Sequence, residues 1–437
     1  MFRKPGRCPG VWGLMALASV HLLSAGEFRL TPAAPTLDRW VYPYGDFSGD
    51  RPVAPTFASF DPRFDTRDGQ FLLGWDTAPA LPSGSGAANY LIRRVRLTLT
   101  IQADRAFEYD PTHDSYLTYQ TNHPGYVPDA DPGRPVELFG AGYRNGFTAA
   151  SFTETSPNGP LNPISSGNIS IGTRNAFAAV HGPDGALLDI ANNVGQANPG
   201  WTNAPFEVRS WAVGQTTNVA AGELVPSDAR VTFDVDLSDP LVTGYLQSAL
   251  NDGRLRLFLS SLSPAAQITP GGIGGGGGGA YPQWATKENL LYDGPALEIE
   301  GSVVTPVDTD DDGLPDDWEK FYLRNLDAGA GEDSDRDGMT NADEWVAGTD
   351  PDNAASLLRI LSAEYDSEGN ARLRFPVAPS RSYRVEFGGQ PGGWISAQGE
   401  LTFPEPGIAE FHELKQTDPP FGPPAAFYRV VIAPPAP

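Results

Sequence analysis

Apolar and polar residues alternate along several stretches in the first two thirds of the chain. The pattern is clear at residues 93–102, 229–237, 254–262 and 296–301. In the first stretch, the residues on one face are Val95, Leu97, Leu99 and Ile101, and those on the other are Arg94, Arg96, Thr98 and Thr100. A period of two residues places apolar side chains on one face of a β-strand. Each stretch is therefore predicted to be a half-buried strand.

One helix is predicted among these strands. Asp239 suits the N-cap position, Pro240 the first helical position, and Gly253 ends the pattern. The glycine-rich run at 271–280 is not followed by the Lys-Ser or Lys-Thr of a phosphate-binding loop, so it is predicted to be the flexible tip of a hairpin. The fold class is mainly β, and residues 27–301 are expected to form a large jelly-roll-like β-sandwich.

The alternating pattern returns at the C-terminal end, in residues 354–437. Leu373, Phe375 and Val377 are separated by polar residues or proline, and similar spacing recurs at 383–387 and 428–432. Six or seven short strands in about 80 residues are typical of a small immunoglobulin-like β-sandwich. This segment is predicted to be a second sandwich.

Residues 302–353 between the two sandwiches are strongly acidic. They hold sixteen Asp or Glu against three Lys or Arg, which is more than half of the net charge of −24. Two like charges about 4 Å apart repel each other by roughly 4 kcal/mol near a protein surface. A folded segment of this composition therefore needs a local source of positive charge.

The stretch "DTDDDGLPDDWE" matches a calcium-loop pattern in full, with a glycine at position 6 and a glutamate at position 12. The pattern returns twenty-five residues later in "DSDRDGMTNADE". The predicted ligands of the first loop are Asp308, Asp310, Asp312, Leu314 through its carbonyl, Asp316 and Glu319. Those of the second are Asp333, Asp335, Asp337, Met339 through its carbonyl, Asn341 and Glu344. The other reading is a solvated acidic linker, but a linker does not require glycine and glutamate at fixed offsets twice. About two Ca²⁺ ions are expected.

The flanks differ from those of a helix–loop–helix hand. Pro306 and the β-branched residues around it argue against a helix entering the first loop. Helices are expected to leave the loops, over 315–325 with Pro315 as first helical residue, and over 341–347 with a stop at Gly348. Proline at loop position 8 has no N–H, so the usual pairing of two such loops is in doubt.

These motifs, followed by "GTDPDN" at 348–353, resemble the thrombospondin type 3-like and dockerin-like calcium repeats of exported bacterial proteins. In such repeats the ion shapes the chain, and the resemblance implies that Asp350 or Asp352 adds a ligand. The tail resembles the small sandwich that often follows such repeats. Residues 27–301 more loosely resemble uncharacterised exported sandwich proteins, some of them related to carbohydrate-binding modules.

The N-terminus has the features of an export signal. Arg3, Lys4 and Arg7 precede an apolar stretch at 11–25 that is too short to span a bilayer. Cleavage is expected after Ala25 or Gly26, so that residues 1–26 form a signal peptide. The only cysteine, Cys8, would be removed with it, which leaves no disulfide or thiolate metal site. A secreted or cell-surface protein without a membrane span is predicted, and its acidity argues against nucleic acid and anionic membranes.

The sequence does not decide whether the large sandwich is an enzyme, and we favour a non-catalytic protein. Zinc-protease and α/β-hydrolase signatures are missing. A cluster of His113, Tyr116, Tyr119 and His123, followed by Arg134 and Arg144, is compatible with a sugar-acid lyase, although an ordinary polar loop is the simpler interpretation. Aromatic candidates for stacking on sugar rings are Trp40, Tyr42, Tyr44, Trp201, Trp211 and Trp284.

Three hypotheses follow. The first is an exported protein with a calcium-rigidified spacer between two sandwiches that acts in adhesion or glycan binding at the cell surface. Its partner would be an extracellular polysaccharide or a cell-surface glycan. The second is a polysaccharide lyase or hydrolase with its site in residues 27–301. The third is a structural matrix component.

Overall fold

The computed structural model describes residues 19–22, 26–32, 34–42, 49–59, 65–119, 121, 123–159, 174–195, 204–265, 268–269, 272–273, 281–388, 393–414 and 427–433. These residues are mainly β, as the sequence predicts, with three α-helices among them. Cys8 and most of the predicted signal peptide lie outside the described residues. So does most of the glycine-rich run, of which Gly272–Ile273 forms β15, paired with β14 (Ile268–Thr269).

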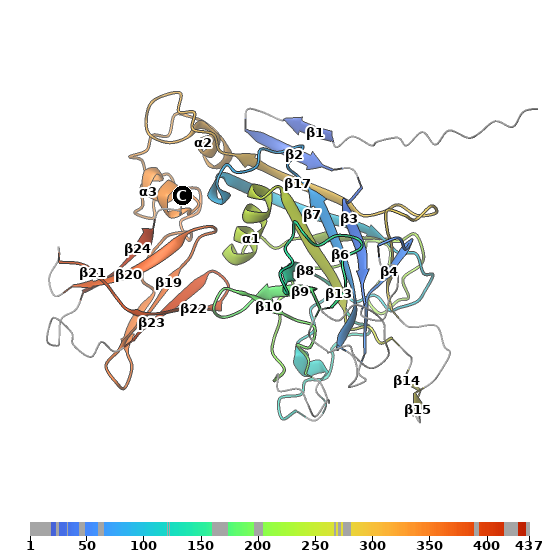
Figure 1. The fold of residues 1–437 in the computed structure, drawn as a ribbon. Helices are drawn as coiled ribbons and strands as arrows, with labels where there is room; N and C mark the ends of the chain where they lie inside the picture. The colour runs from blue at the N-terminus through green and yellow to red at the C-terminus, as the bar shows by residue number, and fades with distance from the viewer. Residues whose placement is uncertain are drawn as a thin grey trace, which may run out of the picture.

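The first sheet of the large sandwich has five antiparallel strands (Figure 1). Their order is β1 (Ser19–Leu22), β2 (Glu27–Thr31), β17 (Ala296–Val303), β7 (Tyr90–Thr100) and β12 (Arg230–Asp234). In β7, Val95, Leu97 and Leu99 are buried as predicted. Arg94 and Arg96 point to the other face, where they pair with Asp234. The predicted strands at 93–102, 229–237 and 296–301 are thus confirmed. A signal peptide cleaved after Gly26 would remove β1 and leave β2 at the sheet edge.

The second sheet packs against the first and has eight strands. Its main path is β10 (Leu187–Asp189), β9 (Ala176–His181), β8 (Val136–Tyr143), β13 (Arg254–Ser261), β6 (Arg67–Asp76) and β3 (Leu37–Val41). Two short strands join it, β11 (Ala212–Val213) beside β8 and β5 (Phe57–Ala58) beside β6. A separate pair is formed by β4 (Val53–Pro55) and β16 (Gln283–Ala285).

Apolar side chains fill both faces of the eight-stranded sheet. Leu257 and Leu73 point into the main core between the two sheets, with Leu97 opposite them. Leu72 and Phe258 point to the other face, where they form a second core with residues of the covering loops, such as Phe152. Burial on both faces explains why β8 and β9 read as nearly continuous apolar runs instead of alternating ones. It also means that β13 is a strand, as predicted, but not a half-buried one.

Helix α1 (Pro240–Asn251) begins and ends where the sequence predicts. The side chain of Asp239 accepts a hydrogen bond from the backbone N–H of Leu241, which satisfies one of the free donors of the first turn. Gly253 follows the helix at φ +70°, a backbone conformation that favours glycine. Val242, Leu246 and Leu250 bury one side of α1 in the main core.

The C-terminal segment forms a second, smaller sandwich. One sheet is β18 (Ser362–Tyr365), β19 (Ala371–Pro376), β23 (Ile408–Glu413) and β22 (Gly399–Glu405), and the other is β21 (Ile395–Ser396), β20 (Ser382–Gly388) and β24 (Phe427–Ala433). Seven described strands in sheets of four and three agree with the prediction of an immunoglobulin-like sandwich. Leu373, Phe375 and Val385 lie in its core.

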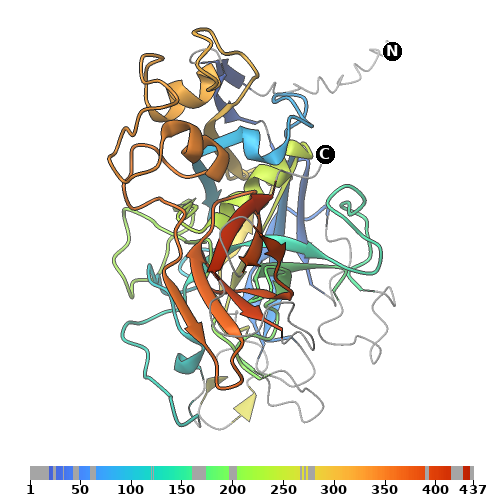
Figure 2. The ribbon, with the colours of Figure 1, turned by 90° about the vertical axis from the view of Figure 1, so that its left-hand side faces the viewer.

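Helices α2 (Asp316–Tyr322) and α3 (Asn341–Ala347) lie above the C-terminal sandwich and beside the large one, as two views at right angles show (Figures 1 and 2). Both leave an acidic loop, as predicted, and the first loop is entered by strand β17. The start of α2 differs by one residue from the prediction. Pro315 is its N-cap with extended backbone, the helix begins at Asp316, and it ends at Tyr322 rather than at residue 325.

Candidate metal centre

The two acidic loops have matching backbone conformations although their sequences differ. At position 4, Asp311 and Arg336 have φ of 58° and 68°, in the left-handed region that non-glycine residues rarely adopt. At position 6, Gly313 and Gly338 have φ of 99° and 101°. Such values strain any residue with a Cβ. The glycine at position 6 is therefore required by the turn in both loops.

Hydrogen bonds inside the loops also repeat. The N–H of Gly313 donates to Asp308 Oδ2 at 2.9 Å, and that of Gly338 donates to Asp333 Oδ2 at 3.0 Å. Each bond links loop position 6 to position 1. In the second loop the N–H of Met339 donates to Asp337 Oδ1 at 2.7 Å, and the N–H at position 7 of the first loop makes the matching bond at 2.8 Å. These bonds fix the aspartates, and the other oxygens of Asp308 and Asp337 have no hydrogen-bond partner.

Three carboxylates converge in each loop. One oxygen of each lies within 4.8 Å of the others in the groups Asp308–Asp310–Asp312 and Asp333–Asp335–Asp337. Several inward oxygens have no hydrogen-bond partner, among them Asp308 Oδ1, Asp335 Oδ2 and Asp337 Oδ2. The structure therefore brings together the predicted ligands at positions 1, 3 and 5 of both loops.

The glutamates at position 12 are the most deeply buried carboxylates of the two loops. Glu319 and Glu344 are 0% exposed, and neither oxygen of either carboxylate has a hydrogen bond. Burial, followed by the charges of nearby aspartates, raises the pKa of each to about 7. A buried carboxylate is costly unless it is paired with a cation or coordinates a metal. The two sites fit an oxygen-coordinated ion at this point.

The residues at position 9 make hydrogen bonds within their own loops. Asp316 accepts hydrogen bonds from Thr309 Oγ1 at 2.8 Å and from Lys320 Nζ at 2.9 Å. The bond from Lys320 is the main reason why the pKa of Asp316 is lowered. In the second loop, Asn341 Oδ1 bonds to Ser334 Oγ at 2.9 Å. In both loops position 9 thus binds the hydroxyl at position 2, and Asp316 is not among the three converging carboxylates of its loop.

The other predicted ligands are two backbone carbonyls at position 7 and an aspartate that follows the second loop. The side chain of Leu314 is buried in an apolar cluster, so its backbone carbonyl stays the candidate ligand, as at the half-buried Met339. Asp350 Oδ1 accepts the N–H of Asp352 at 3.1 Å and closes a turn. The charge of Asp350 contributes to the raised pKa of Glu344, which places it near the second loop.

Each loop closes on itself. The N–H of Asp316 donates to the carbonyl of Val307 at 2.8 Å, and the N–H of Asn341 donates to that of Glu332 at 2.7 Å. Both bonds join position 9 to the residue before position 1. This arrangement avoids the missing N–H of Pro315 at position 8 and replaces the usual pairing between two loops.

A backbone connection nevertheless joins the two loops through Ala330. Its N–H donates to Asp312 Oδ2 of the first loop at 2.7 Å. Its carbonyl accepts the N–H of Ala342, in the first turn of α3, at 3.0 Å. The first carboxylate group is therefore only two hydrogen bonds away from the helix that carries Glu344.

A small apolar cluster anchors this segment to the large sandwich. Trp318 of α2 is buried against Leu314 and against Leu91 of β7. Its ring lies edge-on to Trp345 of α3, with centroids 5.9 Å apart. The guanidinium of Arg93 lies over the ring of Phe321, 4.5 Å from its centroid. The aromatic residues of both exit helices thus meet at one point.

The C-terminal sandwich contacts the other side of the segment. Arg381 donates hydrogen bonds to the carbonyls of Val346 at 3.0 Å and Trp345 at 3.1 Å, at the C-terminal end of α3. The two sandwiches also touch directly, through Ser380 Oγ and Gln247 Oε1 at 2.6 Å. The acidic segment is therefore packed between two domains that are themselves in contact, and is not an extended spacer.

The histidine and tyrosine cluster of the large sandwich is surrounded by carboxylates. The two ring nitrogens of His113 lie 3.2 Å from Glu137 Oε1 and 3.0 Å from Glu207 Oε1. Tyr119 donates to Asp114 Oδ2 at 3.1 Å, and Arg134 pairs with the same carboxylate at 2.8 Å. Tyr116 and His123 meet edge to face, with ring centroids 6.2 Å apart. Arg144 lies elsewhere, in an ion pair with Asp189. An anionic sugar entering here would meet acidic groups.

Replacing His113 with glutamine is expected to destabilise the large sandwich in a pH-dependent way. The hydrogen bonds to Glu137 and then Glu207 raise the pKa of His113 from 6.5 to about 10. Because the folded pKa lies above the unfolded one, the stabilisation is complete below about pH 6.5 and is lost as the pH rises through 10. His113 is partly exposed, so the cost should be only about 1–2 kcal/mol at pH 6 and near zero at pH 10.5. Urea unfolding midpoints of the unaltered protein and the H113Q variant at the two pH values measure this difference in stability. An equal loss of stability at both pH values would contradict the prediction.

Most of the predicted sugar-stacking aromatics belong to the core. Trp40, Trp211 and Trp284 are buried, and Tyr42 stacks on Trp40 with ring centroids 4.5 Å apart. Tyr44 and Trp201 lie outside the described residues. The described aromatics of this set therefore serve packing, and the structure gives none of them an open face for a sugar.

Comparison with known proteins gives no relative for this chain. No protein-family model matches it, and neither a curated protein nor a solved structure does. Among the described helices, none has the length and apolar character needed to cross a bilayer. The interpretation of the site therefore rests on its geometry.

Proposed function

We propose that this chain is an exported, non-catalytic protein in which two Ca²⁺ ions fix the acidic segment at residues 302–353, which we call the junction between the two β-sandwiches. The single observation that supports this most is the pair of buried glutamates. Glu319 and Glu344 end two loops of matching geometry, and their carboxylates have no hydrogen-bond partner. Two equivalent groups left unpaired in this way are best explained by a common ligand with positive charge.

The chemistry of the donor set favours Ca²⁺ over other ions. All side-chain donors are carboxylate oxygens, which suit hard cations rather than zinc or copper. A glutamate that binds through both oxygens, three aspartates and one backbone carbonyl give six oxygen donors before any water is counted. Ca²⁺ accepts six to eight oxygens in flexible geometry, whereas Mg²⁺ requires a near-octahedral set and keeps several waters.

The ion would act on the structure of the junction. Without it, aspartates with oxygens within 4.8 Å of one another repel, and the apolar packing of the segment is limited to the small cluster around Trp318. With it, repulsion becomes coordination, and the free energy of binding contributes to folding. Because α2 packs on the large sandwich and α3 on the small one, an ordered junction sets how the two domains face each other.

A role in adhesion or glycan binding at the cell surface is our proposal for the protein as a whole. The lyase alternative is less well supported, because His113, Tyr119 and Arg134 are each engaged with a carboxylate and no electropositive site for a uronic acid is formed by them. A hydrolase in residues 27–301 and a purely structural matrix role stay open. A glycan array distinguishes binding from the matrix role.

The proposal is tested by counting ions on the full chain. Calorimetric titration with Ca²⁺ is expected to show two fewer bound ions in the double variant E319Q/E344Q than in the unaltered protein, since glutamine cannot provide a bidentate carboxylate. The control is D293N, which removes one exposed acid of the large sandwich and should leave the count unchanged. An E319Q/E344Q protein that binds as many ions with the same affinity would refute the proposal.

A further inference from the structure

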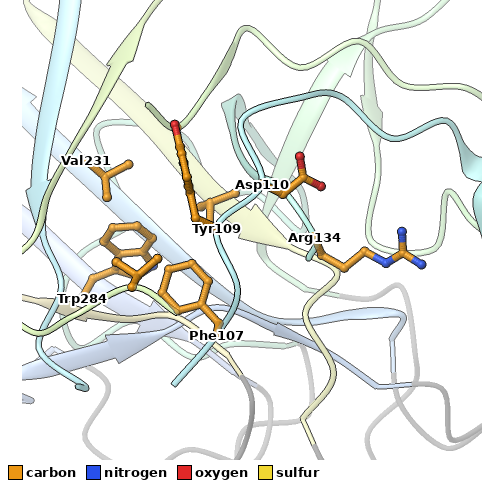
Figure 3. A pocket seen from close by; sticks show the side chains of 9 residues that line it. Phe107, Tyr109, Asp110, Arg134, Val231 and Trp284 are labelled. Carbon is orange, nitrogen blue, oxygen red and sulfur yellow. The ribbon is translucent and has the colours of Figure 1, made fainter. Parts of the chain in front are cut away.

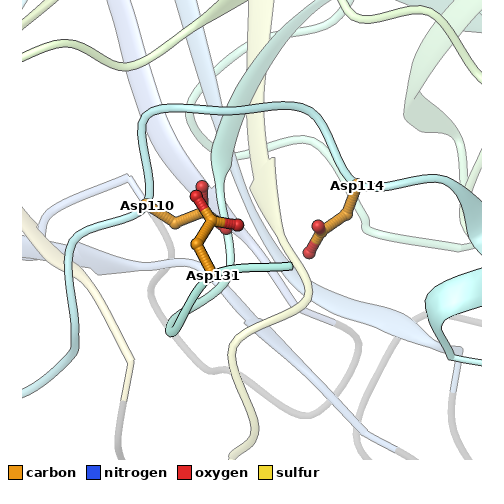
Figure 4. Close-up of side chains that lie close together, drawn as sticks. All are labelled: Asp110, Asp114 and Asp131. Atoms are coloured by element: carbon orange, nitrogen blue, oxygen red, sulfur yellow. The ribbon is translucent and has the colours of Figure 1, made fainter. Parts of the chain in front are cut away.

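A third group of carboxylates lies far from the acidic segment, at one end of the large sandwich. Asp110, Asp114 and Asp131 each offer an oxygen within 4.8 Å of the others. Figure 4 shows the three carboxyl groups turned toward one another across the space between two loop segments. One segment follows residue 109 and carries Asp110 and Asp114, and the other precedes β8 and carries Asp131. Neither segment matches the calcium-loop pattern.

Asp110 is buried without a partner for one of its oxygens. Its side chain is 3% exposed, and Oδ2 has no hydrogen bond. The other oxygen, Oδ1, accepts the N–H and the hydroxyl of Thr112 at 2.8 and 2.9 Å. The same hydroxyl lies 3.1 Å from Asp131 Oδ2. One O–H proton cannot serve both carboxylates at once, so this pair is held close with too few donors.

The nearest cation does not neutralise the group. Arg134 pairs with Asp114 at 2.8 Å, but it also pairs with Asp129. The single positive charge of Arg134 is therefore shared between Asp114 and Asp129. Asp110 and Asp131 form no ion pair with it. The surplus of negative charge at the group matches a divalent cation.

Apolar walls close one side of the group. Asp110 and Arg134 line the edge of a small cavity of about 10 Å³ whose other walls include Phe107, Val231 and Trp284. Figure 3 shows the charged ends of Asp110 and Arg134 pointing away from these apolar side chains. A cavity of this size holds about one water. It is therefore too small to be a ligand pocket.

The approach of the two segments is built into the backbone. Gly133 has φ +103°, and a Cβ at this position would lie 3.0 Å from the carbonyl oxygen of Glu108 and 3.1 Å from the Cβ of Asp110. Only glycine allows the segment with Asp131 to lie so close to Asp110. The convergence of the three carboxylates is thus fixed by the fold rather than by chance contact at the surface.

We propose that Asp110, Asp114 and Asp131 form a third cation site, which binds a hard divalent ion such as Ca²⁺ and ties the two loop segments together. Each aspartate provides one oxygen, and the unpartnered Oδ2 of Asp110 is the central ligand. The site lies in the large sandwich and is independent of the two loops at the junction. Its ion stabilises the loop end of this sandwich, where His113 and Tyr119 also lie.

The test uses the full chain with the junction loops disabled, so that the third site is measured alone. In equilibrium dialysis against Ca²⁺, the E319Q/E344Q protein is expected to retain one bound ion. Adding D110N or D131N should weaken this remaining binding by at least roughly 10–100-fold, the range seen when even outer-shell partners of a metal are lost. The matched control adds D293N to the same background and should keep the ion.

Two variants are used because D110N alters a buried residue, whereas Asp131 is partly exposed and its replacement should leave the fold intact by circular dichroism. An E319Q/E344Q protein that binds no Ca²⁺ up to 10 mM, or a D131N derivative that binds as tightly as its parent, overturns the third site. Failure of the junction sites is recognised separately, because E319Q/E344Q would then bind as many ions as the unaltered protein.

Discussion

Removal of calcium is expected to destabilise the acidic segment by about 5 kcal/mol, and this is the largest effect we predict. A ligand present at 100 times its dissociation constant stabilises the folded state by about 2.7 kcal/mol per site, and two equivalent sites double this value. The aspartates of each loop, which lie within 4.8 Å of one another, then repel without compensation. We expect α2 and α3 to open while both sandwiches stay folded.

Trp318 and Trp345 report this change, because both lie in the cluster between the exit helices. Chelation should shift their fluorescence to longer wavelength and make residues 304–353 the preferred site of limited proteolysis. Re-addition of Ca²⁺ should reverse both effects, and Mg²⁺ at the same concentration should reverse them only weakly. Fluorescence and cleavage patterns that ignore chelation would show that the segment is ordered without an ion.

Replacing Trp318 with alanine is expected to cost about 3–5 kcal/mol in the calcium-loaded protein, the range for the loss of a large buried aromatic side chain. Trp318 is the central contact of the cluster that joins α2 to Leu91 of the large sandwich and to Trp345 of α3. The cost should nearly vanish after chelation, because the segment is then already open. Hydrogen exchange of the α2 amides measures the free energy of opening in both conditions.

The control for this substitution is W318F, which keeps an aromatic ring in the cluster and should cost less than half as much. A second comparison adds E344Q. In the presence of calcium, this substitution should reduce the loss of stability caused by W318A, as chelation does. If W318A destabilises α2 equally with and without calcium, packing and ion binding are independent, and the ion does not order the junction.

Most of the strands that the sequence predicts have one solvent-exposed face, but β13, predicted from the same alternation, is buried on both faces. β7 and β12 alternate because their outer residues, such as Arg96 and Asp234, pair with each other in solvent. The alternating pattern is lost in β8 and β9, which are buried on both faces. The order of the strands could not be predicted either, since β17 pairs with β2 nearly 270 residues away and only the packing of the whole core selects that partner.

For the candidate site, too, only part of the geometry could be predicted from the sequence. The converging aspartates of the two junction loops could be predicted because each group comes from one twelve-residue stretch, and the glycine at position 6 follows from the geometry of the turn. The ion pair of Asp316 could not, because its partner Lys320 is one helical turn away and lies outside the loop pattern. Asp110, Asp114 and Asp131 were missed altogether, since two segments form the group. The Asp-x-x-x-Asp spacing alone is too common to indicate a site.

The backbone connection through Ala330 has a consequence for how the junction fills. When an ion draws Asp312 into place, the N–H of Ala330 is fixed with it, and its carbonyl is then set to receive the first turn of α3. Under the proposed function, binding of the first ion would therefore order part of the second loop in advance. The occupancy of the two loops by calcium should consequently rise steeply over a narrow range of free calcium concentration. The orientation of the two domains would then be either fixed or free, and molecules with one ion bound would be rare.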